Sequence, residues 1–200
     1  MRFKRFLPVF SMIALAMLAV GCAEAPETEM KEAQTGLDDA RNSAQADIWA
    51  PDEFQSAKSS FDAANAEVEE QNERFGLTRS YDKAQEMYAQ VKTDAEKAKR
   101  AAISNKEAAK IEAGQKLEEA TAAIESARAA LSKAPRTKGT RADIALLTSD
   151  LDGLDQSLEE VRGMITSEDY HGAISRATAV SQEAGEMSTM LSEATMRARR

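Results

Sequence analysis

Residues 80–133 decide the fold, and they read SYDKAQEMYAQVKTDAEKAKRAAISNKEAAKIEAGQKLEEATAAIESARAALSK. The stretch contains no proline and a single glycine, Gly114, and its apolar residues recur at steps of three and four. That spacing gathers them on one face of a helix. A glycine inside a helix costs about 1 kcal/mol relative to alanine, which a packed helix can absorb. The stretch therefore predicts one continuous helix of about 54 residues, roughly 80 Å long.

Two more helices are predicted on the N-terminal side of this stretch. Pro51 suits the first position of the second helix, and Asp52 and Glu53 suit the positive end of its dipole. Gly76 is the expected left-handed residue at its end. The apolar stripes are Met30, Ala33, Leu37, Ala40 and Ala44 for the first helix, and Phe54, Ala57, Phe61, Ala64, Val68 and Phe75 for the second.

Two further helices are predicted on the C-terminal side, after a loop at residues 134–139. Thr140 and Asp143 offer a capping box for the first of them, and Ser167 is the expected cap of the second. Their apolar stripes are Ile144, Leu147, Leu151, Leu154, Leu158, Val161 and Ile165, and then Tyr170, Ala173, Ala177, Val180, Ala184, Met187, Leu191 and Ala194.

The apolar pattern of the first half reappears in the second half, at an offset that varies only from 87 to 90 residues. Tyr81 falls opposite Tyr170, and the pair Ala40-Arg41 falls opposite Ala127-Arg128. Any two alanine-rich helices can be slid into partial agreement, but periodicity alone does not demand these matches. The pattern therefore predicts a duplicated unit of about 85 residues.

The predicted fold class is all-α and elongated. Two tandem three-helix units, residues 30–110 and 111–200, are joined by a long shared helix. An extended coiled-coil oligomer is the alternative, because repeating heptads also suit it. Recurring turns and the small burial that each alanine supplies favour helices folded back within one chain. A homo-oligomer formed through an exposed stripe stays open.

The N-terminal segment has the features of an export signal. Arg2, Lys4 and Arg5 form a positive region, and residues 6–20 are uncharged and mostly apolar. This length is typical of a secretory signal and is short for a permanent membrane span, which needs about 20 apolar residues. Residues 1–21 are therefore predicted to be a signal peptide.

Residues 18–22, Leu-Ala-Val-Gly-Cys, resemble the bacterial lipobox, although Ala19 stands where that motif usually has leucine. The resemblance implies cleavage before Cys22 and its acylation with chains such as palmitate, which leaves residues 22–29 as the lipidated N-terminus and linker. The alternative is ordinary cleavage after Ala23, giving a soluble periplasmic protein. The lone cysteine favours lipidation, because a free thiol in an oxidising compartment is a liability.

The expected location is the periplasmic face of the outer membrane. In the bacterial lipoproteins that this segment resembles, an aspartate directly after the cysteine retains the protein at the inner membrane of a two-membrane cell. This chain has Ala23 at that position. Without residues 1–21 the chain has 23 cationic and 34 anionic residues, a formal net charge of −11. Such a surface is attracted poorly to anionic headgroups except through its lipid.

The composition leaves little for catalysis. One histidine and one cysteine supply no His/Cys cluster for a metal and no nucleophile pair. Carboxylates that are adjacent in a helix point about 100° apart and do not converge on a substrate. The acidic balance argues against a nucleic-acid partner, because such binding depends on neutralising phosphates. We therefore expect a non-enzyme without a metal or cofactor.

Three residues are candidate partner contacts. Trp49 is either an exposed anchor, because tryptophan is enriched in binding hot spots, or a cover over the end of the bundle, which is the favoured reading. Arg136 and Lys138 lie in the loop that forms the one positive spot on an acidic chain. Anionic envelope polymer is a candidate partner for this spot, and a solvated loop is the default.

Residues 37–102 contain the run Leu37-Asp38-Asp39-Ala40-Arg41, the pair Ala50-Pro51 and a helix led by Tyr81. Together they resemble a helical domain of unknown function found in bacterial envelope lipoproteins. The resemblance implies a helical fold and an envelope location, and it brings no catalytic residues. The expected function is a non-enzymatic, membrane-tethered spacer or adaptor with an envelope protein as partner. The alternative is a periplasmic carrier or chaperone that holds an apolar ligand or an unfolded outer-membrane protein.

Overall fold

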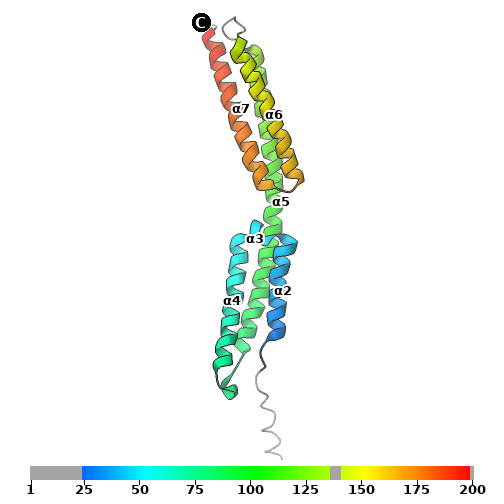
Figure 1. Ribbon diagram of the computed structural model, residues 1–200, viewed down its shortest axis with the longest axis vertical. Helices are drawn as coiled ribbons and strands as arrows, with labels where there is room; N and C mark the ends of the chain where they lie inside the picture. Colours follow the sequence, from blue (N-terminus) through cyan, green and yellow to red (C-terminus); the bar gives the residue numbers. More distant parts are fainter. Residues whose placement is uncertain (1–23, 136–140, 199–200) are drawn as a thin grey trace, which may run out of the picture. The chain divides into compact units, whose positions relative to one another are not determined.

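The computed structural model describes residues 24–135 and 141–198. Every regular element in these ranges is a helix, which confirms the all-α class (Figure 1). None of these helices is both long and apolar enough to cross a membrane. Contacts within the chain divide it into two units, and the boundary falls between Ile103 and Ser104, whereas the sequence placed it after residue 110.

The first unit is built from three long helical segments with two short helices between them. The second long segment returns antiparallel to the first, and the third runs parallel to the first (Figure 1). In chain order the elements are α2 (Glu27–Ala44), α3 (Ala46–Trp49), α4 (Pro51–Glu73), the 3-10 helix η2 (Gly76–Thr78) and the first part of α5 (Asp82–Lys133).

Small residues set the packing of α2 on α5. A Cβ atom added to Gly36 would lie 3.6 Å from the Cβ of Ala95, which is ordinary van der Waals contact. Lys92 Nζ lies 2.5 Å from Glu32 Oε2, and Lys99 pairs with Asp39. Each of these α2 residues therefore faces an α5 residue about 60 positions later, which fixes the parallel register of the two helices.

The connection from α2 to α4 contains a helix that the sequence did not predict. Gln45 adopts a left-handed conformation with φ 53°, and its N–H donates to the carbonyl of Arg41 over 3.0 Å. This bend ends α2 and starts the four-residue helix α3. Pro51 then takes the first position of α4, as predicted.

The second unit contains the rest of α5 together with α6 (Arg141–Thr166) and α7 (Tyr170–Ala198). Helix α5 continues through Gly114 without a break. The apolar stripes predicted for α6 and α7 are half-buried or buried up to Leu191, whereas Ala194 is exposed. The buried apolar residues of these two helices are Leu151, Leu154, Leu158, Val161, Tyr170, Ala173, Ala177, Val180, Ala184 and Leu191.

The turn between α6 and α7 corrects the predicted cap. Asp169, and not Ser167, precedes the helix, and its carboxylate accepts a hydrogen bond of 3.0 Å from the N–H of Gly172. Ser167 instead donates from its hydroxyl to the carbonyl of Met164. Glu168 adopts φ 64°, and α7 therefore begins two residues later than expected. The capping box at Thr140 lies outside the described residues.

The helices of each unit pack on one another, which confirms helical bundles within a single chain. Tyr81 and Tyr170, which the sequence matched, are both buried where a long helix begins. The internal repeat itself stays a prediction.

Candidate functional site

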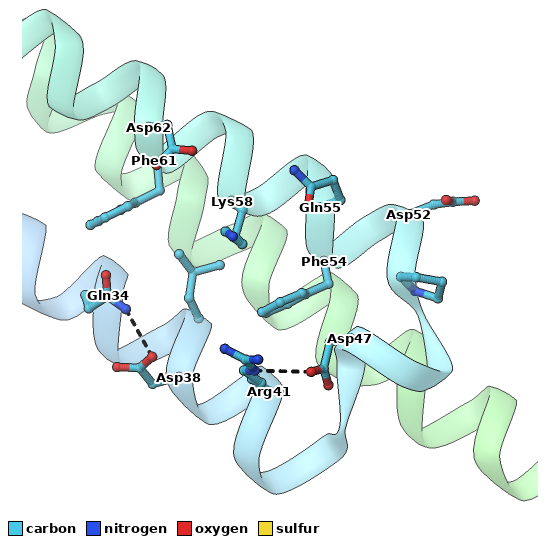
Figure 2. A pocket seen from close by; sticks show the side chains of 12 residues that line it. Gln34, Asp38, Arg41, Asp47, Asp52, Phe54, Gln55, Lys58, Phe61 and Asp62 are labelled. Atoms are coloured by element: carbon cyan, nitrogen blue, oxygen red, sulfur yellow. Dashed lines mark hydrogen bonds and ion pairs between the residues drawn. The ribbon is translucent and has the colours of Figure 1, made fainter.

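A hollow surface of the first unit lies between α2 and α4. Two adjoining cavities, of about 650 Å³ and about 730 Å³, share Gln34 and Phe61 in their walls. Figure 2 shows the first of them, with Phe54 and Phe61 extending from α4 toward α2. We call the two cavities together the α2–α4 groove.

The groove has an apolar floor and a charged rim. Leu37, Phe54, Phe61, Val68 and Tyr88 supply the apolar surface. Two bonds organise the rim in Figure 2: Arg41 Nε donates to Asp47 Oδ2 over 3.1 Å, and Gln34 donates to Asp38 over 3.0 Å. The charged residues around the first cavity are Asp38, Arg41, Asp47, Asp52, Lys58 and Asp62, which gives an excess of negative charge.

Tyr88 joins the floor of the groove to the core. Its ring lies 5.8 Å from that of Phe61 in a tilted arrangement, and its hydroxyl donates to Asn65 Oδ1 over 2.7 Å. Burial raises the pKa of the Tyr88 phenol above its ordinary value of 10.0. The phenol is therefore a neutral donor near pH 7, and it holds the floor of the groove in place.

A polar network ties α4 to α5 at one end of the first unit. The buried carboxylate of Glu67 accepts hydrogen bonds from Lys83 over 2.5 Å and from Gln71 over 2.9 Å. These bonds, that from Lys83 first, hold the pKa of the Glu67 carboxyl below its ordinary value of 4.5. Gln71 also accepts from the N–H of Ser80 over 3.3 Å. The network therefore joins α4 to the start of α5 and to the turn between them.

The tip of this hairpin, residues 74–80, differs from the prediction. Helix α4 ends at Glu73, so Phe75 leaves the apolar stripe and is 74% exposed, and Leu77 is equally exposed. Gly76 does not adopt a positive φ and begins η2 instead. The expected left-handed cap is therefore wrong, because the chain leaves α4 in an extended conformation at Arg74.

Trp49 is the only one of the candidate site residues that falls within the described residues. Its side chain is 7% exposed, so it belongs to the core beneath the α3 turn and covers the end of the bundle. An exposed anchor would need most of its ring at the surface. Cys22, Arg136 and Lys138 lie outside the described residues.

The described carboxylates lie apart or in ion pairs. Within residues 24–135 and 141–198, no three His, Cys, Asp or Glu side chains come together in a way that could hold a metal ion. The carboxyl of Asp39 has a pKa below 3.8 because Lys99 and Ser43 donate to it, and that of Glu168 has a pKa below 4.5 because Lys106 does. These groups hold charge next to cations, so their visible role is to join helices.

No match is found among protein-family models, curated proteins or solved structures. The resemblance of residues 37–102 to a domain of envelope lipoproteins therefore stays a prediction.

The sequence predicts neither the groove nor the tip. Both depend on how three helices pack, and a stripe of apolar residues does not show which of its members stay partly open. One signal for the tip was present: Gly76 and Thr78 stand between two arginines, Arg74 and Arg79, in a chain that is otherwise acidic.

Proposed function

We propose that this protein is a non-enzymatic envelope lipoprotein, held on the periplasmic face of the outer membrane by a lipid on Cys22. The N-terminal sequence supports this function, because a positive region, an apolar run and a single cysteine follow one another there. Acyl chains contribute about 0.8 kcal/mol for each buried methylene, so several chains give stable attachment without a membrane span.

The start of the folded unit supports a short tether. Pro26 is buried, and α2 begins at Glu27. The four residue steps from Cys22 to Pro26 reach at most about 14 Å when fully extended. A lipid on Cys22 would therefore keep the first unit next to the bilayer.

We further propose that the first unit acts as an adaptor and that the α2–α4 groove receives an amphipathic helix of an envelope protein. The apolar floor would cover the apolar face of such a helix. The rim of the groove carries four aspartates and only two basic residues. The flanks of the bound helix should therefore be basic.

Fractionation tests the anchor. Cys22→Ala should move the protein from the membrane fraction to the soluble fraction, because it removes the acylation site. Retention of the variant in the membrane would contradict the anchor.

Photo-crosslinking in intact cells tests the adaptor. A photoreactive residue in place of Gln55, on the groove rim, should capture a defined partner, whereas one in place of the exposed Gln182 in α7 is the control. Charge reversal by Asp52→Lys with Asp62→Lys should weaken the adduct at position 55. Equal adducts at positions 55 and 182, or an adduct that is insensitive to charge reversal, would contradict binding in the groove.

A carrier for an apolar ligand is the second candidate, and the second cavity favours it. Met30, Phe61, Val68 and Tyr88 give this cavity a mainly apolar lining. A nonpolar fluorescent dye should then bind the unacylated Cys22→Ala protein, and Phe61→Asp should abolish the signal. Failure of the dye to bind would count against the carrier function and leave the adaptor function standing.

A further inference from the structure

The tip of the α4–α5 hairpin, residues 74–80, combines apolar and positively charged side chains at the surface. Phe75 and Leu77 are each 74% exposed, more than any other large apolar residue in the described part of the chain. The same seven residues include Arg74 and Arg79 and no carboxylate, in a chain with a formal net charge of −8. Exposed apolar side chains beside cations are typical of a segment that binds at a lipid interface.

Internal hydrogen bonds hold the tip in shape. Arg79 donates from its guanidinium to the carbonyls of Arg74, over 2.9 Å, and Asn72, over 2.6 Å. Thr78 donates from both its N–H and its hydroxyl to the carbonyl of Phe75, each over 2.8 Å. These bonds satisfy the carbonyls of Asn72, Arg74 and Phe75 within the turn, while the side chains of Phe75 and Leu77 remain exposed.

The register of α2 on α5 shows where the tip lies in the first unit. Glu32 faces Lys92 and Asp39 faces Lys99, so Glu27, the first residue of α2, is level with Met87. Helix α5 begins five residues earlier, at Asp82. At 1.5 Å per residue the hairpin therefore extends roughly 7 Å beyond the start of α2. Figure 1 shows the tip at the end of the unit where α2 begins.

The chain that leads to Cys22 leaves from this same end. Pro26 is buried against the unit, and the four residue steps from Cys22 to Pro26 span at most about 14 Å. A bilayer that holds a lipid on Cys22 thus lies within reach of a tip that projects beyond Glu27. The length and exit point of this tether identify the membrane as the occupant of the exposed apolar surface.

We infer that the hairpin tip docks on the lipid bilayer, with Phe75 and Leu77 entering the headgroup region and Arg79 facing the lipid phosphates. The inference rests on the proposed anchor at Cys22. Arg74 contributes less charge than Arg79, because it pairs with Glu70 over 2.5 Å. An acyl anchor and a tip contact together form two attachments, so the first unit keeps a fixed orientation on the membrane and does not swing on its tether.

The single natural cysteine makes this inference measurable. When acylation occupies the Cys22 thiol, Leu77→Cys or Phe75→Cys provides one free thiol for a nitroxide label. Both side chains are exposed, so neither substitution removes a buried contact. The full mature lipoprotein is placed in vesicles of phosphatidylethanolamine and phosphatidylglycerol, and label collisions with oxygen and with a water-soluble nickel chelate are compared.

The controls are Ile48→Cys, 55% exposed at the opposite end of the same unit, and Leu146→Cys, 63% exposed in the second unit. We expect the ratio of oxygen to nickel collisions to be several-fold higher at positions 75 and 77 than at both controls. Ratios equal to the controls, in protein that stays with the vesicles, would overturn the tip contact and leave the anchor intact. Shielding from both reagents would also overturn it, because it would indicate a protein contact. Protein that does not stay with the vesicles would overturn the anchor, and the tip contact with it.

Discussion

The predicted repeat matches different side chains of the two units at the seams between their helices. Where the first unit has Tyr88 on α5, the matched position of the second unit is Ala177 on α7, and both are buried. Phe61, half-buried in the first unit, corresponds to the fully buried Leu151. Because the spacing of packed helices follows the size of the side chains between them, the first unit keeps room for a groove beside Tyr88. Two three-helix units can therefore differ in how closely their helices pack, with a groove left open in the first unit and the matched residue buried in the second.

The largest effect is expected at Tyr88, the residue that distinguishes the units. Tyr88→Ala introduces the second unit's residue and should destabilise the first unit by about 4 kcal/mol, because it removes a buried ring and leaves a cavity. Tyr88→Phe is the matched control and should cost about 1 kcal/mol, the value of the bond to Asn65. Urea unfolding followed by the fluorescence of Trp49 reports on this unit alone. Equal effects of the two variants would contradict a packing role for the ring.

A second pair compares a residue of the groove with its matched core residue. Leu151→Ala should destabilise the second unit by about 3 kcal/mol, because the side chain is fully buried. Phe61→Ala should cost only about 1 kcal/mol, since part of the ring already faces the groove. Hydrogen exchange measured by mass spectrometry separates the two units. A loss at Phe61 as large as that at Leu151 would show that the groove is part of a closed core.

The turn of the second unit provides a smaller test. Asp169→Ala should cost about 1 kcal/mol through loss of the helix cap. Gly172→Ala should have a similar effect, because a Cβ there would lie 2.2 Å from the Asp169 carboxylate and displace it. Gly163→Ala, in open space within α6, should instead stabilise by up to about 1 kcal/mol. Thermal unfolding that ranks the two glycine variants in the opposite order would contradict the assigned cap.

The smallest effect is the response to acid. Asp39 and Glu67 in the first unit have pKa values below their ordinary values, so the stability they contribute is present above about pH 4.5 and is lost as the pH falls further. Glu67→Gln should reduce the loss of unfolding free energy of the first unit as the pH falls, measured by Trp49 fluorescence. Glu69→Gln, at an exposed position, is the control. If Glu67→Gln loses stability in acid as the unsubstituted protein does, the Glu67 carboxylate does not contribute to the pH dependence.

The sequence was sufficient to predict the five long helices and the apolar face of each, because spacing alone decides which face of a helix is apolar. Ala33, Leu37 and Ala40 are buried as the stripe predicts, and α5 continues through Gly114. The turns were harder. Gln45 and Glu168 adopt positive φ without being glycine, and no local pattern marks either residue.

The groove and the tip could not be read from spacing. Phe75 fits the apolar stripe of α4, but the helix ends two residues before it. Arg79 instead donates to the carbonyls of Asn72 and Arg74 and stabilises the turn that follows the helix. Such a choice depends on contacts between residues in the turn and not on periodicity. The predicted roles of Cys22, Arg136 and Lys138 lie outside the described residues and stay predictions.

Mass spectrometry of the N-terminal peptide from membrane-purified protein gives a direct test of the lipid anchor. We expect the chain to begin at Cys22 and this residue to carry acyl chains. A chain that begins at Glu24 without modification, after cleavage behind Ala23, would contradict it, as would a chain that keeps residues 1–21.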